Sequence, residues 1–309
     1  MMFGTKEPFE YFQCGRCGCL QISDIPKDLG AYYPSEYYSF NPRREPSEPK
    51  PAARQLLEKW RTRTALFGCG YKLARIASQV VDLPPQVRAM GPWLKKCGIR
   101  SFEARFLDVG CGSWSWWLSD LKALGFRNLL GVDPFVAGDL EDTGVSILKR
   151  RIDQVSGRFE LITFHHSLEH VADQVATLAA ARSLLTTNGS CLVRLPLVSS
   201  AVWEQYRTDW VELDAPRHLY LHSLDSIKLV AAQAGLQLVE HFSDSTEFEF
   251  WGSEQYRRDL PLMAEESFLR APGKSNFTFR EMSAFKARAK EANREGRGGR
   301  GCFFFRAAT

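Results

Sequence analysis

Short apolar runs alternate with amphipathic stretches through the middle of the chain. The runs ARFLDVG (104–110) and NLLGVD (128–133) are each cut short at a glycine or an acid, as buried strands are. Three further runs of this kind are VSILKR (145–150), FELITFHHS (159–167) and SCLVRLP (190–196). Strands that alternate with helices indicate a parallel sheet with helices on both of its faces.

Helices are predicted between and after these strands, at 114–126, 168–186 and 224–235. The last of them has clear end signals, because Ser223 is a good N-cap and Gly235 can adopt the left-handed conformation after the final turn. Two more strands are expected at LQLVEHFS (236–243) and TEFEFWG (246–252). The pattern therefore predicts a doubly wound α/β fold with a mostly parallel, seven-stranded sheet.

The segments that flank this α/β domain have a different composition. A small N-terminal cysteine-containing segment (1–45) holds CGRCGC at 14–19, and a helical linker region (46–100) follows the proline-rich, charged stretch at 41–51. From Ala52 to Val81, apolar residues fall on one helical face: Leu57, Trp60, Phe67, Tyr71 and Ala74. The α/β domain is expected at 101–262. A basic, Gly/Arg-rich extension occupies 263–309, and its stretch 285–301 is predicted to be disordered.

Composition narrows the class of protein. With 44% hydrophobic and 25% charged residues, the 309-residue chain is typical of soluble globular proteins. The net charge of +4 permits an acidic substrate but does not require nucleic acid. The eight cysteines are mostly scattered, which favours a reducing, cytoplasmic location. No signal peptide and no transmembrane segment are predicted, because no apolar stretch has the required length.

A glycine-rich turn follows the first predicted strand, in the sequence Asp108-Val-Gly110-Cys-Gly112. Glycines at a strand-to-helix turn let the backbone approach a ligand closely, and the helix N-terminus offers free N–H groups. Asp133 ends the next strand, 21 residues after Gly112, where a carboxylate can accept both hydroxyls of a ribose. Together these features predict a cofactor that contains adenosine.

Two positions discriminate between the possible cofactors. A nicotinamide-binding turn needs a third glycine, and that position is Ser115. The carboxylate of Asp108, two residues before the first glycine, would repel a pyrophosphate and suits a ligand with an ammonium or sulfonium group. An NAD-dependent oxidoreductase is therefore the less favoured alternative.

The segments FLDVGCGSW, GVDPF, FELITFHHSLEHV and LLTTNGSCLVRLP resemble, in order and spacing, the motifs of class I S-adenosylmethionine-dependent methyltransferases. The likeness is greatest to a subgroup with an N-terminal cysteine segment, often linked to bacterial surface-polysaccharide or secondary-metabolite pathways. It covers about 102–262, and 11–40 more loosely. The resemblance implies a Rossmann-like enzyme that uses S-adenosyl-L-methionine. It also implies a small-molecule acceptor, either a sugar or glycan precursor or a natural-product intermediate.

The resemblance also implies roles for individual residues. The methionine part of the cofactor would be held by Asp108, Gly110 and Gly112, and the ribose by Asp133. The adenine would be flanked by Ile152 and Asp153, while the strand end that faces the methyl group holds His165, His166 and Ser167. One departure is Trp114, which replaces a usual third glycine and either crowds the methionine tail or points back into the helix. If Trp114 closes the site, the chain would be a binding module without turnover.

Candidate acid–base residues have competing interpretations. His166 is the preferred general base, since a histidine can deprotonate a hydroxyl or amine near neutral pH; it could equally line the pocket. His218, in a segment that lies over the active-site mouth in the resembling subgroup, is a candidate base or substrate ligand. Arg217 could hold an acidic group or brace the loop through an ion pair. For Glu169 and His170 a structural role is favoured.

Other side chains allow two interpretations as well. Cys14 and Cys17 have zinc-ribbon spacing, but a structural zinc needs four ligands and Cys19 is too close in sequence, so no metal site is predicted. An aromatic group could form a wall for the acceptor or part of the core: Trp203, Tyr206 and Trp210. The basic helical face and the Arg/Gly tail are read as solvated, and no nucleic-acid partner is expected. The oligomeric state is left open.

Overall fold

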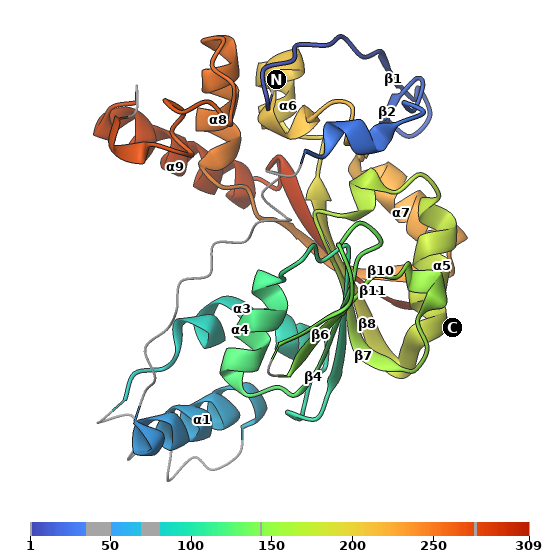
Figure 1. Ribbon diagram of the computed structural model, residues 1–309, viewed down its shortest axis with the longest axis vertical. Coiled ribbons are helices and arrows are strands. Elements are labelled where there is room, and N and C mark those ends of the chain that lie inside the picture. Colours follow the sequence, from blue (N-terminus) through green and yellow to red (C-terminus); the bar gives the residue numbers. More distant parts are fainter. Residues whose placement is uncertain (1, 35–50, 69–80, 143, 275–276, 309) are drawn as a thin grey trace. The chain divides into compact units, whose positions relative to one another are not determined.

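The computed structural model describes residues 2–34, 51–68, 81–142, 144–274 and 277–308 (Figure 1). The chain divides into two compact units. The first, called here the glycine-turn unit, comprises 35–165 and 179–192; the second, the histidine unit, comprises 1–34, 166–178 and 193–308. Most of the predicted linker at 41–51 and the second half of the helical stretch, including Tyr71 and Ala74, lie outside the described residues.

The glycine-turn unit is built on a sheet. Its strands are β3 (Arg105–Val109), β4 (Asn128–Val132), β5 (Leu140–Asp142), β6 (Val145–Leu148), β7 (Phe159–His165) and the first part of β8 (Leu185–Pro196). Strand β3 pairs in parallel with both β4 and β7, and β4 pairs in parallel with β6. The short strand β5 pairs antiparallel with β6 at the edge of the sheet. The carboxyl ends of β3, β4 and β7 therefore meet at one edge.

Local sequence explains the elements that surround the glycine turn. Four of the five residues of β3 are buried, as expected for a parallel strand that is covered on both faces. Helix α4 comprises Trp116–Leu124. Its N-cap is Ser115, whose hydroxyl accepts a hydrogen bond from the Leu118 N–H, and its C-cap is Gly125 in the left-handed conformation. Helices α1 (Ala52–Phe67) and α3 (Pro85–Lys96) pack against each other, and α3 contacts α4 (Figure 1).

The histidine unit contains two groups of strands. Strands β10 (Leu236–Ser243) and β11 (Arg300–Ala307) pair antiparallel, with a register shift between Leu238 and Glu240. A three-stranded sheet joins β1 (Tyr11–Gln13), β2 (Leu20–Ile22) and β9 (Tyr220–Leu221). Its helices are α6 (Ala201–Tyr206), α7 (Leu224–Gln233), α8 (Phe248–Arg257) and α9 (Phe279–Arg294). The described residues of this unit also form five short 3-10 helices: η1 (Leu29–Tyr32), η3 (Leu168–His170), η4 (Arg207–Asp209), η5 (Val211–Leu213) and η6 (Pro272–Lys274). Helix α5 (Gln174–Leu184) and strand β8 belong partly to each unit.

The predicted doubly wound α/β fold is confirmed. Within the described residues, the main sheet has eight strands in the order β10-β11-β8-β7-β3-β4-β6-β5, one more than predicted. Six of the seven predicted strands are present, and the two that were not predicted are β5, a three-residue edge strand too short to leave a periodic signal in the sequence, and β11 (Arg300–Ala307). The predicted helix ends at Ser223 and Gly235 are also confirmed, since Ser223 caps α7 and Gly235 has a φ of 73°.

The strand predicted at 246–252 is wrong, because most of this stretch belongs to helix α8. Its alternating phenylalanines suggested a strand. The helix is buried nearly all round, including the polar residues Glu249 and Ser253, and a helix without an exposed face has no amphipathic stripe to reveal it. Gly252 lets it pack closely, since a Cβ there would lie 2.8 Å from a methyl carbon of Val211.

The disorder predicted for 285–301 is also wrong. Helix α9 covers much of it and starts with a capping box in which Thr278 and Glu281 bond each other's backbone N–H groups. The T-x-x-E pattern at this position was the signal in the sequence. After the glycines, β11 carries Phe303 and Phe305 into the core, where both are fully buried. The terminal run of phenylalanines is therefore a strand of the sheet.

Candidate functional site

The glycine turn lies at the carboxyl ends of β3 and β4. Gly110 and Gly112 have positive φ angles of 72° and 64°, which residues with a Cβ rarely adopt. The Gly110 N–H donates to the carbonyl oxygen of Val132 at 2.8 Å, so the turn is fastened to the end of the neighbouring strand. This turn is the one predicted from the sequence.

Asp133 closes the opposite side of the turn. Its Oδ2 accepts a hydrogen bond from the Gly112 N–H at 3.0 Å, and its Oδ1 accepts one from the Phe135 N–H at 2.8 Å. Burial raises the pKa of Asp133, and these two N–H groups oppose that rise. Each oxygen keeps a second lone pair, so the carboxylate can still accept ligand hydroxyls.

Phe135 was not singled out from the sequence. Its side chain is 69% exposed, although it follows the acid by only two residues. A large exposed aromatic ring beside a carboxylate is a feature of ligand sites more than of cores. The signal in the sequence was its place two residues after the acid that ends the strand.

Asp108 was expected to contact the ligand directly, but its carboxyl group binds side chains of the protein. It is buried, and its two oxygens accept hydrogen bonds from the hydroxyls of Ser115 at 2.6 Å and Thr163 at 2.8 Å. Burial raises the pKa of Asp108 to about 6, against these hydrogen bonds. The carboxyl group thus ties β3 to α4 and β7 and shapes the turn. Its contact with a cofactor stays a prediction.

The predicted adenine-flanking pair lies in the 3-10 helix η2 (Ile152–Gln154), which follows β6 in the chain. Ile152 is buried, and Asp153 is exposed with its carboxylate 3.2 Å from the Arg151 side chain. An apolar side chain beside an acid can offer both a face and an acceptor to a purine.

His165 ends β7 and packs against two tryptophans of α4. Its ring centroid lies 5.2 Å from that of Trp116 and 4.8 Å from that of Trp117. Trp117 is fully buried, whereas Trp116 is 41% exposed. Trp114 is half-buried and directly precedes the N-cap of α4. Trp116 therefore stands beside the predicted cofactor residue His165, although only Trp114 was singled out from the sequence.

The second segment of the histidine unit begins at His166. Its φ is 53°, a left-handed conformation that is strained for a residue with a Cβ and that often marks functional positions. Its backbone N–H donates to the carbonyl oxygen of Arg194 at 2.9 Å. Its Nδ1 lies 3.6 Å from Oε1 of Glu169, so this backbone geometry brings the imidazole to a carboxyl group.

The side chain of Glu169 is fully buried, with 0% exposure. Neither carboxyl oxygen has a hydrogen-bond partner among the described residues. Burial raises the pKa of Glu169 to about 8. A buried carboxyl group in this state either keeps its proton or requires a cation beside it.

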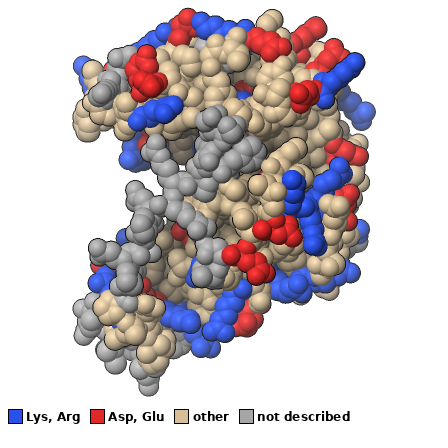
Figure 2. All heavy atoms as spheres, in the orientation of Figure 1, with Lys and Arg blue, Asp and Glu red and all other residues tan. Residues whose placement is uncertain are grey.

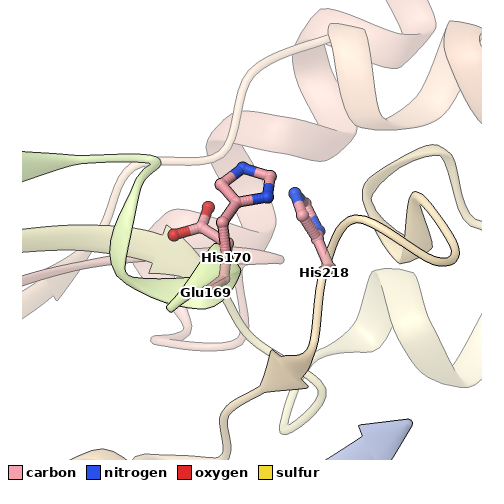
Figure 3. A group of neighbouring side chains, drawn as sticks. All are labelled: Glu169, His170 and His218. Carbon is pink, nitrogen blue, oxygen red and sulfur yellow. The ribbon is translucent and has the colours of Figure 1, made fainter. Parts of the chain in front are cut away.

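His170 and His218 face each other, with ring centroids 4.7 Å apart (Figure 3). The Nδ1 of His170 is 2.9 Å from the Arg217 carbonyl oxygen, and the Nδ1 of His218 is 2.7 Å from the Glu212 carbonyl oxygen. A carbonyl oxygen only accepts, so each Nδ1 carries the proton. Burial lowers the pKa of both rings, that of His170 to about 3, so both are neutral.

The structure brings Glu169, His170 and His218 together, although His218 is 48 residues further along the chain. One ligand atom from each of the three lies within 4.8 Å of the others. This grouping was not predicted, because nothing in the local sequence pattern links η3 to the loop before β9; a structural role was expected for Glu169 and His170, and His218 was a separate candidate.

Arg217 braces its own loop, the second of the two interpretations given above. Its guanidinium binds the Asp214 carboxylate through two nitrogens and donates to the Tyr32 carbonyl oxygen at 2.9 Å. The pair is buried, and Arg217 holds the pKa of Asp214 below its ordinary value even though burial opposes this. Tyr206 and Trp210 belong to the apolar core, with Trp203 packed at its edge.

Cys14, Cys17 and Cys19 lie in the hairpin between β1 and β2. Cys14 and Cys17 are partly exposed, and Cys19 is buried. Backbone N–H groups of Cys17 and Arg16 lower the pKa of the Cys14 thiol. Among the described residues, the one group with the spacing of a metal site is Glu169, His170 and His218, and it contains no cysteine.

A family model described as a methyltransferase domain matches residues 74–241, more than half of the chain. The chain belongs to this methyltransferase family. The predicted S-adenosylmethionine-dependent methyltransferase is thereby confirmed as an enzyme class, with S-adenosylmethionine as the cofactor. No curated protein matches the sequence significantly.

Several solved structures are similar to this methyltransferase. The cyclopropane synthase MmaA2 from Mycobacterium tuberculosis is 16% identical, with a TM-score of 0.46 over 71% of this chain and 83% of that one. An S-adenosylmethionine-dependent methyltransferase from Mesorhizobium loti is 16% identical, with a TM-score of 0.43 over 71% and 97%. A phosphoethanolamine N-methyltransferase from Haemonchus contortus is 16% identical, with a TM-score of 0.42 over 73% and 53%.

Two surface properties of the methyltransferase bear on its partners. No described helix combines the length and the apolar composition that crossing a membrane would take. On the face in Figure 2, basic and acidic side chains of the described residues are interspersed.

Proposed function

We propose that this methyltransferase transfers the methyl group of S-adenosylmethionine to a small-molecule acceptor, a sugar or glycan precursor or a natural-product intermediate. The observation that carries the proposal is the hydrogen bond of 3.0 Å from the Gly112 N–H to Oδ2 of Asp133. It joins the backbone that would take the methionine part to the carboxylate that would take the ribose. The acceptor class is supported by the resemblance of the sequence motifs.

In this proposal the glycine-turn unit holds the cofactor. Gly110 and Gly112 give the methionine part close access to the backbone, and Asp133 accepts the ribose hydroxyls. Ile152 and Asp153 flank the adenine, and Phe135 offers an exposed ring for it to stack on. His165 packs against Trp116 and Trp117 at the end of β7. The next residue in the chain is His166.

The histidine unit supplies the base. Because His165 and His166 are consecutive, the chain passes directly from the cofactor residues to the acceptor residues. His166 takes the proton of the acceptor nucleophile, which attacks the methyl carbon in line. S-adenosylmethionine, held by Gly110, Gly112 and Asp133, would supply the methyl group, and its sulfur would take the electron pair of the broken bond, giving neutral S-adenosylhomocysteine. Most of the acceleration comes from positioning, and the base adds about 10²- to 10⁴-fold.

The test is a methyl-transfer assay with hydroxylated acceptors, namely nucleoside diphosphate sugars and phenolic precursors, in which S-adenosylhomocysteine formation is measured. The wild type should turn over at least one acceptor, and His166→Gln should lower kcat by about 100-fold or more while cofactor affinity persists. His241→Gln is the matched control, since His241 is an exposed histidine of the same unit. Tight cofactor binding without transfer to any acceptor would instead support a binding module.

A further inference from the structure

We propose that Glu169, His170 and His218 form a binding site for a divalent transition-metal ion, and that this ion binds the acceptor through an oxygen atom. The three residues offer two imidazoles and one carboxylate within 4.8 Å of one another. All three lie in the histidine unit, so the site is complete within one compact part of the chain. The catalytic consequence rests on the proposed methyl transfer, but the ion binding does not.

Both histidines present a nitrogen lone pair that is ready for a metal. The backbone carbonyl oxygens of Arg217 and Glu212 fix the proton of His170 and of His218 on Nδ1. This leaves Nε2 as the electron-pair donor on each ring, and metal-binding histidines are commonly oriented by such a hydrogen bond on the other nitrogen.

Glu169 supplies the negative charge and the reason for a cation. Its carboxyl group is fully buried without a hydrogen-bond partner among the described residues. The Nδ1 atom of His166 lies 3.6 Å from Oε1 of Glu169, so the proposed base is next to the proposed ion site. A buried carboxyl group that lacks partners is costly, and a bound cation would remove this cost.

The arrangement requires only a small adjustment to bind an ion. Figure 3 shows the ring of His170 between the Glu169 carboxyl group and the ring of His218. Ligand atoms bonded to one ion at about 2.0–2.2 Å can be at most about 4.4 Å apart. In a tetrahedral site such atoms lie about 3.5 Å apart, so the separation of up to 4.8 Å in the structure calls for side-chain movements of about 1 Å.

The ligand set selects the kind of ion and of acceptor. Imidazole and carboxylate donors without thiolate suit Mn²⁺, Fe²⁺, Co²⁺ or Zn²⁺. Three protein ligands leave coordination positions open, which distinguishes a catalytic site from a closed structural one. An acceptor hydroxyl bound there would have a lowered pKa and lose its proton to His166 more readily. The inference therefore favours O-methylation.

The experiment is calorimetric titration of the chelator-treated full chain with MnCl₂ and CoCl₂, without methyl donor or acceptor, together with the visible absorption spectrum of the Co²⁺ form. The variants are Glu169→Gln and His218→Gln. Glu169→Gln is nearly isosteric with the protonated acid, so it should fold like the wild type; unfolding curves of the metal-free proteins check this. His241→Gln controls for loss of any histidine, and a Cys14→Ser/Cys17→Ser double variant removes the thiols.

We expect one ion per chain and a Co²⁺ spectrum that responds to the ligand variants. Glu169→Gln and His218→Gln should each weaken binding by tenfold or more, while His241→Gln and the double cysteine variant bind like the wild type. The proposal is overturned if the wild type binds neither ion, if both ligand variants bind normally, or if loss of the thiols alone abolishes binding. Cofactor binding, measured separately, would survive that result, so the two failures are distinguishable.

Discussion

Gly131→Ala tests whether the packing beneath the glycine turn controls cofactor binding. Gly131 lies in β4, and a Cβ added there would lie 2.6 Å from Sγ of Cys111, 3.2 Å from Cγ1 of Ile147 and 3.3 Å from Cδ1 of Leu118. The first distance is far below a normal contact, and Cys111 is the residue between the two glycines of the turn. The added methyl group must therefore push on the turn itself.

The magnitude follows from overpacking. Inserting a methyl group into a packed core costs about 1–3 kcal/mol, and the lower chain entropy of alanine offsets about 0.4–1 kcal/mol of this. We expect a net loss of about 1–2 kcal/mol in the free energy of unfolding, with severalfold weaker binding of S-adenosylhomocysteine. Gly138→Ala is the control, because nothing lies within 4 Å of a Cβ there and its stability should change by about 0.5 kcal/mol or less.

The decisive assay is a double-mutant cycle with Cys111→Ala, which removes the 2.6 Å contact and leaves only the two milder ones. Urea unfolding and calorimetry are measured for all four proteins. The double variant should be more stable than the sum of the single effects by about 1 kcal/mol, and should regain cofactor affinity. Additive effects, or a Gly131→Ala protein with wild-type stability and affinity, would refute the reasoning.

Two further predictions concern stability. The pKa of Asp108 is raised from 3.8 to about 6 in the folded chain, so its contribution is full below about pH 4 and is lost, by about 3 kcal/mol, as the pH rises through 6. Urea unfolding should show Asp108→Asn gaining stability relative to the wild type by that amount between pH 4 and pH 7; parallel pH profiles would count against it. Phe303→Ala should cost about 3–5 kcal/mol, because the side chain is 0% exposed in β11, whereas Phe279→Ala, at 89% exposure, should cost under about 0.5 kcal/mol. Equal effects of the two substitutions in thermal unfolding would contradict the placement of β11.

Local signals in the sequence predicted the part of the site that a short stretch of chain can build. The turn from Gly110 to Gly112 follows directly from a buried strand and precedes a capped helix, so glycine content and hydrophobic period identify it. Asp133 is found by the same logic, since it ends the next strand. The structure adds the hydrogen bond that joins the two, which no spacing rule provides.

The features that sequence analysis missed depend on contacts between distant residues. Strand β11 was hidden because its pairing partner β10 ends 57 residues before it begins, beyond the reach of local patterns. Helix α8 was hidden because its burial leaves no polar face. The grouping of Glu169 and His170 with His218 depends on a loop that Arg217 and Asp214 hold in place, and a single sequence gives no sign of which loop approaches η3.

The most direct test of the account is calorimetric titration of the wild type, Asp133→Ala and Asp139→Ala with S-adenosylhomocysteine. Asp139 is an exposed aspartate of the same unit and serves as the control. The account predicts micromolar binding by the wild type and by Asp139→Ala, and loss of binding in Asp133→Ala. Absence of binding by the wild type, or equal binding by all three proteins, would contradict the assignment of the glycine turn and Asp133 as the cofactor site.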